Sequence, residues 1–221
     1  PDQGCVEGDV IDAPGTAAAD RFDDGNDAFG FGLYEGAFGM AILSKYPIDY
    51  DAVRTFQEFL WRDMPSSLIP DRAIGALPQW YSNEEAAVYR LSSKNHVDVP
   101  ILVDVGGIDE VIHVLGSHPT PPVFDDEINA AGEQCNFNSA LSTPELCVDP
   151  HGRRNHDEIR FWADYVSKTG HECYAYDDAG VPGCLGPGRR FVVMGDQNAD
   201  PQFGDSFASA ILQLLNEPNV D

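Results

Sequence analysis

Basic residues are scarce in this sequence, and their scarcity restricts the partners that the protein can bind. The chain has 13 Lys and Arg against 37 Asp and Glu, a formal net charge of −24 that is spread along its length. Affinity for nucleic acid comes largely from neutralising phosphates with Lys and Arg. The balance argues against tight binding to DNA or RNA, whereas a small or exposed phosphoester remains an admissible substrate. Solubility in salty or extracellular surroundings and capture of divalent cations explain the acidity equally well.

Long apolar runs are missing as well. No stretch approaches the roughly 18 apolar residues of a membrane-spanning helix, and the first residues lack the charged and apolar regions of a signal peptide. We therefore expect no membrane span, and any signal peptide would have been removed or lies outside this sequence. A chain of 221 residues, 43% of them hydrophobic, fits one domain with a sizeable core. We expect it to be a monomer.

Metal-binding spacings are missing among the five cysteines. No pair has a CxxC spacing and no His flanks a pair at zinc-finger distance, which disfavours a structural zinc site. Cys135 with Cys147, and Cys173 with Cys184, each bracket a short loop rich in Gly, Pro, Asn or Asp. We predict two local disulfides and hence an oxidising, secreted or periplasmic location; five reduced cysteines in a cytosolic protein are the alternative. Cys5 is left over.

Apolar patterning predicts several strands. Residues 39–48 form an apolar run closed by a Pro turn, typical of a buried strand with Ile42 and Leu43 in the core. Residues 97–103 alternate between apolar and polar, and a Gly-Gly turn at 106–107 leads into a further apolar run, so a β-hairpin is the simplest connection. Residues 190–195 are typical of another buried strand.

Helical periodicity is clearest from Asn155 onward. Asn155 is the expected N-cap, and one face carries the apolar residues Ile159, Trp162, Ala163 and Val166. Residues 206–215 are expected to form an amphipathic helix, and residues 84–90 a short helix or the start of a strand. Residues 52–63 have helical spacing, although a loop with one helical turn is equally consistent.

Strands interleaved with helices, partly linked by hairpins, indicate a mixed α/β fold without internal repeats. We predict a single domain over residues 1–221. Within it, residues 1–30 are expected to be a surface loop, and residues 123–153 and 170–188 loop insertions.

Polar side chains follow two of the predicted strands. Phosphoester hydrolysis needs an activated water, a cation or donors for the phosphoryl oxygens, and a group that relieves the leaving oxygen. Asp196 and Asn198, two residues apart on a strand end, should point the same way, whereas Gln197 faces away. His118 ends another strand, where it can donate to a phosphoryl oxygen or accept a proton. Alone, Gly-Asp-x-Asn is also a good turn sequence, and a lone His is more often structural.

Three motifs, in this order, resemble those of the endonuclease/exonuclease/phosphatase family, whose fold is called DNase I-like. Residues 39–48 (GMAILSKYPI) are similar to the family's strand G-x-A-I-L-S-R-Y-P-I, and residues 113–118 (HVLGSH) to its strand ending in a catalytic His. Residues 195–201 (GDQNADP) are similar to its G-D-x-N-x-x-P. A helix near residues 154–160 also fits, so the resemblance covers roughly residues 30–215. It implies a four-layer α/β/β/α sandwich of two facing mixed sheets, with the active site at one edge.

The resemblance also implies residue roles in a metal-dependent phosphoester hydrolase. His118 would bind and polarise the scissile phosphate, and Asp196 would orient or deprotonate the attacking water. Asn198 would hold the phosphate or the metal environment, so that Asp196 and Asn198 lie beside Mg²⁺ or Mn²⁺, with Ca²⁺ as a further candidate. Lys94 or His96 would be an additional phosphate contact, although a solvated Lys and a surface His are the ordinary interpretation.

The sequence departs from the family in three places. The metal-proximal Asn of the family's first strand, the metal-binding Glu of its second and its final Asp-His pair do not occur here. We expect the chain to be a central segment of a longer protein, with the sandwich incomplete. Without the Glu a cation would bind weakly, and the isolated segment could be inactive.

Two hypotheses about function follow. The first is a divalent-metal phosphodiesterase or phosphatase acting on a small or exposed phosphoester, with nuclease activity disfavoured by the net charge of −24. The alternative is a non-catalytic binding or surface module that keeps the fold but lacks the metal ligands.

Overall fold

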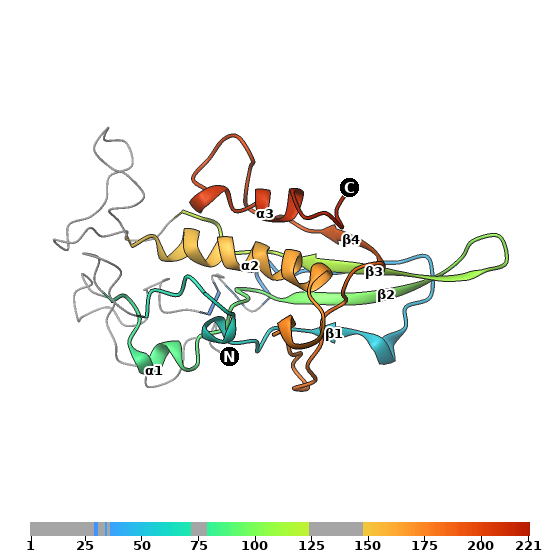
Figure 1. The fold of residues 1–221 in the computed structure, drawn as a ribbon, viewed down its shortest axis with the longest axis horizontal. Helices are drawn as coiled ribbons and strands as arrows, with labels where there is room; N and C mark the ends of the chain where they lie inside the picture. Colours follow the sequence, from blue (N-terminus) through green and yellow to red (C-terminus); the bar gives the residue numbers. More distant parts are fainter. Residues whose placement is uncertain (1–28, 31–33, 35, 72–78, 124–147) are drawn as a thin grey trace.

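A four-stranded mixed sheet organises the protein (Figure 1). The computed structural model describes residues 29–30, 34, 36–71, 79–123 and 148–221, and the statements below refer to these residues. The strands, in spatial order, are β1 (Arg54–Thr55), β2 (His96–Asp104), β3 (Asp109–Ser117) and β4 (Arg190–Met194). β1, β2 and β3 pair antiparallel, and β3 pairs parallel with β4.

The hairpin predicted between β2 and β3 is confirmed. Asp104 pairs with Asp109, and the chain reverses through Gly106 and Gly107, whose φ angles are 67° and 86°. Two successive positive φ angles are what a tight hairpin turn of the primed kind requires, and glycine adopts them without steric cost. Figure 1 shows the tip of this hairpin extending away from the rest of the molecule.

Helix α2 (Pro150–Ser167) provides the crossover between the parallel strands β3 and β4. It begins six residues earlier than expected. Asp149, not Asn155, is the N-cap: its carboxylate accepts a hydrogen bond from the Gly152 amide at 2.6 Å, and Pro150 occupies the first helical position. Asn155 lies in the second turn and is fully buried. Because it does not cap the helix, its side-chain amide is available to bond to other segments.

The core lies between α2 and one face of the sheet. The predicted apolar face of α2 is confirmed, since Ile159, Trp162, Ala163 and Val166 are buried. Most of the remaining volume is aromatic, and edge-to-face pairs such as Phe56 with Phe161, 5.2 Å between ring centroids, join the chain before β2 to the helix. The short helix α3 (Leu212–Leu215) packs on α2 from the other side (Figure 1).

The strand predicted for residues 39–48 is wrong. This segment has a single isolated bridge to the sheet, between Ile48 and Ile101, and Leu43 is 92% exposed. The free edge of β2 is occupied further along by β1, so residues 39–46 lie instead over the sheet face opposite α2. Ile42 does reach the sheet there, where its Cδ1 lies 3.4 Å from the position of a Cβ on Gly116.

Three shorter segments were predicted with mixed success. The short helix before Arg90 is α1 (Asn83–Ala86), held by a capping box between Ser82 and Glu85. Residues 52–63 match the alternative of a loop with one helical turn, since the short strand β1 is followed by the single turn η2 (Trp61–Asp63); the turn η1 (Tyr50–Ala52) precedes β1. The single helix expected over residues 206–215 is divided into η5 (Phe207–Ser209) and α3, because the backbone of Ala208 is left-handed with φ 47°.

The loop after η4 (Gly170–Glu172) carries the predicted Cys173–Cys184 disulfide, which is confirmed with a Cα–Cα distance of 5.7 Å. Arg54 of β1 reaches into this loop: its Nε lies 2.9 Å from Asp177 Oδ2, and its Nη1 donates to the Gly183 carbonyl at 2.6 Å. The Cys135–Cys147 pairing lies outside the described residues. Residues 150–153 of the predicted insertion 123–153 belong to α2. Within the described part of the chain, no helix has the length and apolarity to cross a membrane.

Candidate active site

The candidate site lies where the parallel strands β3 and β4 end side by side. Gly116 pairs with Met194, so His118 and Asp196 leave the sheet at the same edge. Gly195 permits the close approach of the two ends: its φ is 131°, and a Cβ there would lie 1.9 Å from the Ser117 carbonyl oxygen. Any side chain at this position would push the two ends apart.

His118 and Asp196 line one cavity of about 770 Å³. Its other walls are residues 39–44, Tyr46 and the apolar face of β2 and β3 that points away from α2. The Nδ1 atom of His118 lies 3.1 Å from the Phe38 carbonyl oxygen. Because a carbonyl only accepts, Nδ1 carries a proton, and no described residue makes a hydrogen bond to Nε2. His118 therefore keeps one ring nitrogen for a ligand.

Asp196 and Asn198 are linked through a turn, not placed along an extended strand as expected. Asp196 is exposed, and its Oδ1 accepts a hydrogen bond from the Asn198 backbone at 3.0 Å. Asn198 has φ 49°, and its Nδ2 donates to the Pro119 carbonyl at 3.0 Å. The Asn198 amide therefore joins the β4 loop to the residue that follows His118. Its Oδ1 is left as an acceptor, but Asn198 does not line the cavity.

Two buried residues of α2 fix both site loops from beneath. Asn155 Nδ2 donates to the carbonyls of Thr120 at 2.8 Å and of Gln197 at 3.0 Å. Glu158, with no exposed surface, accepts from the Thr120 amide at 2.6 Å and from the Ser93 amide at 2.7 Å. Charge-assisted bonds from backbone amides to a buried carboxylate are strong. Asn155 and Glu158 are thus positioning residues for His118 and Asp196.

Gln197 faces α2, as the alternation along the strand end predicts. Its side-chain amide contacts Ser117 Oγ, with Nε2 at 3.1 Å, and Trp162 Nε1 donates to the same hydroxyl at 2.9 Å. This buried contact ties the end of β3 to the helix. The side chain between Asp196 and Asn198 therefore supports the site from the core side.

His96 does not reach the site. It is buried, with Nε2 2.9 Å from the Glu158 carbonyl oxygen and Nδ1 2.5 Å from Ser92 Oγ. Burial lowers the pKa of His96, so the neutral ring belongs to the core. The expected phosphate contact does not fit this position. Lys94 lines a neighbouring cavity and not the one that His118 and Asp196 line.

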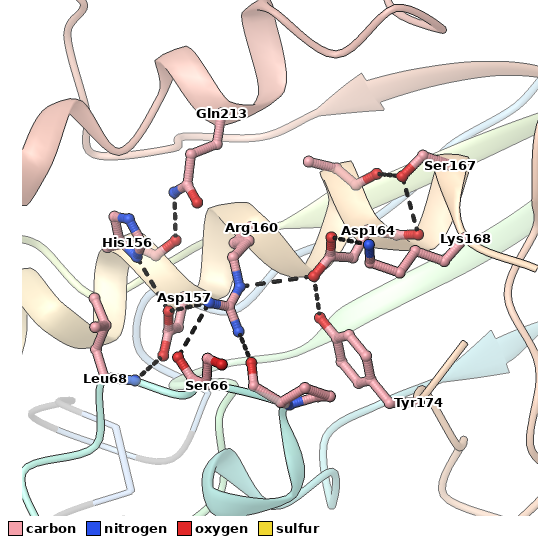
Figure 2. A network of polar contacts seen from close by, with 12 residues as sticks. Ser66, Leu68, His156, Asp157, Arg160, Asp164, Ser167, Lys168, Tyr174 and Gln213 are labelled. Carbon is pink, nitrogen blue, oxygen red and sulfur yellow. Dashed lines mark hydrogen bonds and ion pairs between the residues drawn. The ribbon is translucent and has the colours of Figure 1, made fainter. Parts of the chain in front are cut away.

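Other acidic residues of α2 have structural partners (Figure 2). Asp157 Oδ2 accepts from Trp61 Nε1 at 2.7 Å and from the Leu68 amide at 2.6 Å, anchoring the chain that follows η2. Asp164 accepts from the Tyr174 hydroxyl at 2.8 Å; burial, together with this carboxylate, raises the pKa of Tyr174. These carboxylates bind loops to the helix, and their partners lie outside the candidate site.

The donor set at the strand ends fits a cation that is shared with substrate and water. In the described residues, no group of three or more His, Cys, Asp or Glu could enclose a metal ion. Asp196 offers a carboxylate, and Asn198 offers an amide oxygen. Mg²⁺ usually keeps several waters and binds through one or two carboxylates together with substrate phosphates. A site of this open kind is compatible with these residues, whereas a closed protein cage is not.

Comparison with known proteins identifies the family. A model of the Endonuclease/Exonuclease/phosphatase family matches residues 7–220, nearly the whole chain. The chain belongs to this family. Searches of curated proteins and of solved structures gave no significant match. Membership in the endonuclease/exonuclease/phosphatase family confirms the resemblance and the DNase I-like α/β fold. The described residues contain one mixed sheet covered by α2, consistent with an incomplete sandwich.

Sequence reasoning missed the two positioning residues, although a signal was present. Asn155 and Glu158 are three residues apart and one turn before Ile159 and Trp162, on the side of α2 that faces the core. Polar side chains on a buried helix face need hydrogen-bond partners. Their position next to an apolar stripe therefore indicates that they bind backbone groups of neighbouring loops.

Proposed function

We propose that the protein is a divalent-metal-dependent phosphoesterase. In this proposal Asp196 orients or deprotonates the attacking water, and His118 polarises the scissile phosphate. The observation that supports it is the placement of His118 and Asp196 on one cavity at the shared end of β3 and β4. Family membership supports the reaction class, since the family hydrolyses phosphoesters and is generally metal dependent.

The local geometry supports a distinct role for each side chain. The contact of His118 Nδ1 with the Phe38 carbonyl fixes the ring, so Nε2 is the atom that meets a phosphoryl oxygen. Nε2 donates to that oxygen when it carries a proton and accepts a proton when it does not. The Oδ1 atom of Asp196 accepts a hydrogen bond from the backbone N–H of Asn198, and Oδ2 can accept a proton from water.

Asp196 and the side-chain Oδ1 of Asn198 would hold the cation together with water and substrate. Mg²⁺ or Mn²⁺, with Ca²⁺ as a further candidate, would stabilise negative charge on the phosphoryl oxygens. The net charge of −24 favours a small or exposed phosphoester over a long nucleic acid. We further propose a secreted or periplasmic location, which the Cys173–Cys184 disulfide supports.

Catalytic assays on matched variants test this function. The protein with Mg²⁺, Mn²⁺ or Ca²⁺ is incubated with mono- and bis-p-nitrophenyl phosphate and with plasmid DNA, and we expect the small esters to be cleaved. His118→Gln and Asp196→Asn should each lower kcat by about 10²–10⁴-fold. His171→Gln and Asp205→Asn, both at exposed positions, are the controls and should keep full activity.

The binding-module alternative is favoured by one observation, the lack of a three-residue metal cluster among the described residues. It predicts phosphate binding without turnover of any ester. If no substrate is cleaved with any of the three metals, and Asp196→Ala leaves Mn²⁺ and phosphate binding unchanged, the catalytic proposal is wrong.

A further inference from the structure

A second cavity, of about 570 Å³, adjoins the candidate active site. The two cavities share residues 39–42 and Val97 as lining. The second one, which we call the basic cavity, is lined in addition by Arg90, Lys94, Gln57 and Asn95. Two cations therefore lie in a single cavity of a chain whose formal net charge is −24.

No described residue is a direct ionic partner of either cation. In the described part of the chain, Arg90 and Lys94 form no ion pair. Arg90 Nε is buried without a hydrogen-bond partner there, and its guanidinium lies over the Phe29 ring at 4.3 Å from the centroid. Arg154, by comparison, donates to the carbonyls of Leu91, Arg90 and Phe29. The guanidinium of Arg154 is thus engaged, whereas no acceptor among the described residues bonds to the Nε of Arg90.

Two of the three acids that act on these cations, Asp178 and Glu158, are occupied elsewhere. Glu58 and Asp178 act on Arg90 from a distance, and Glu158 acts on Lys94. Asp178 accepts from Thr55 Oγ1 at 2.5 Å and from the Glu58 amide at 2.7 Å, and both oxygens of Glu158 are bonded to backbone amides. Burial, together with the positive charge of Arg154, lowers the pKa of both Arg90 and Lys94.

Partly buried cations without counter-charges are unfavourable, and an anion placed between them offsets this cost. Asn95 adds a side-chain amide to the lining, whose Nδ2 can donate; its Oδ1 is buried without a hydrogen-bond partner among the described residues. An arginine fork, a lysine ammonium and an amide are the donors that recognise phosphate. The lining of the basic cavity therefore matches an anion in charge and in hydrogen-bonding groups.

We propose that the basic cavity binds a second anionic group of the substrate, with Arg90 and Lys94 as its ligands. The enzyme then acts on phosphoesters that carry a second phosphate: one phosphate meets His118 and Asp196, and the other occupies the basic cavity. This inference rests on the proposed phosphoesterase function. It would give a chain with a formal net charge of −24 a local site for a small anionic substrate.

The binding step is tested with pyrophosphate as the probe, in buffer with a metal chelator. Calorimetry on wild-type protein should detect one site, and Arg90→Gln and Lys94→Gln should each weaken it about tenfold. Arg189→Gln and Lys45→Gln remove exposed cations that line neither cavity and should leave the affinity unchanged. Circular dichroism checks that each variant is folded, and Lys94→Gln decides alone if Arg90→Gln is unstable.

A kinetic arm separates this inference from the function on which it rests. With adenosine bisphosphate, Arg90→Gln and Lys94→Gln should raise KM about tenfold at nearly constant kcat, whereas KM for adenosine monophosphate should be unchanged. Equal effects on both substrates, or pyrophosphate affinity that is unchanged in both variants, overturn the proposal. If no ester is hydrolysed at all, the phosphoesterase function fails, while the calorimetry still decides whether the basic cavity binds an anion.

Discussion

Burial determines the protonation state of His96. A backbone carbonyl only accepts, so His96 Nε2 donates to Glu158 and Nδ1 accepts from Ser92, as a neutral ring does. Burial is the main reason why the pKa of His96 is lowered in the folded protein, with the nearby charge of Arg154 acting in the same direction. The ring packs edge-on against Phe161 with centroids 5.1 Å apart. A protonated His96 ring would be unfavourable in this buried, largely aromatic environment.

The lowered pKa of His96 predicts acid sensitivity. As the pH falls below about 6.5 the unfolded chain binds a proton that the folded state resists, so stability is complete above that pH and decreases below it. The contribution of one proton is at most about 1.4 kcal/mol per pH unit. His96→Gln should show a smaller loss of unfolding free energy between about pH 7 and 5, measured in urea. Exposed His171→Gln is the control and should keep the wild-type slope; an unchanged slope in His96→Gln would contradict the prediction.

Gly195 is a second residue on which the site depends. Gly195→Ala combines a positive φ with a clash against the Ser117 carbonyl, and should lower the unfolding free energy by about 1–3 kcal/mol and abolish most phosphoesterase activity. Gly188 has φ 80° but no atom within 4 Å of an added Cβ. Gly188→Ala therefore shares the backbone strain without the clash. It should keep full activity, and equal activity in the two variants would show that the clash is unimportant.

At the scale of elements, α2 connects the core to both site loops. One side carries apolar residues against the sheet, Asn155 and Glu158 bind the loops after β3 and β4, and Asp157 binds the chain after η2. Figure 2 shows Asp157 and Asp164 on either side of Arg160. Asp157 has no exposed surface, whereas the Asp164 side chain is 20% exposed. The two carboxylates should therefore differ in their contribution to stability.

Parallel substitutions on α2 measure that difference. Asp157→Asn keeps one oxygen for the Trp61 and Leu68 donors, but its NH2 then faces Arg160 and the buried charge that strengthens these bonds is lost. It should lower the unfolding free energy by about 2 kcal/mol or more. Asp164→Asn retains an oxygen for Tyr174 and loses only partly screened ion pairs, so its loss should be below about 1 kcal/mol. Urea denaturation of both variants gives the comparison. Losses of equal size would contradict the assignment of Asp157 as the main anchor.

At the scale of the whole molecule, the Cys173–Cys184 loop fastens the C-terminal part of the chain to β1. Arg54 donates to carbonyls of the loop and pairs with Asp177, and Thr55 contacts Asp178. The pKa of Asp177 is lowered mainly by its hydrogen bond to Arg54, against the opposing effect of burial. In the unfolded chain the disulfide keeps the loop residues Asp177 and Asp178 close to each other, whereas Arg54 and Thr55 lie outside the closed loop.

Removing this disulfide should destabilise the protein. Cys173→Ser combined with Cys184→Ser is expected to lower the unfolding free energy by about 2–3 kcal/mol, because the unfolded chain gains conformational freedom. Denaturant titration measures the change, and peptide mapping by mass spectrometry without reductant reports which cysteines are linked. Linked Cys135 and Cys147 would support the oxidising location, and unlinked ones would contradict it. A double variant as stable as the wild type would show that the Arg54 contacts alone hold the loop.

Local features of the sequence were enough to predict the hairpin, the apolar face of α2, the Cys173–Cys184 pair and the neighbouring positions of His118 and Asp196. Each depends on residue spacing within one segment or on the ends of adjacent strands. The family could also be predicted, because each of its motifs is a short segment and the motifs occur in the family's order.

Only the tertiary structure decided the exposure of Leu43, the burial of His96, the binding of two loops by Asn155 and Glu158, and the meeting of Arg90 with Lys94 in one cavity. These features depend on contacts between segments far apart in the chain. Apolar character shows that a residue prefers burial, and a charge shows that it needs a partner. Neither property specifies which distant part of the chain will bury the residue or pair with the charge.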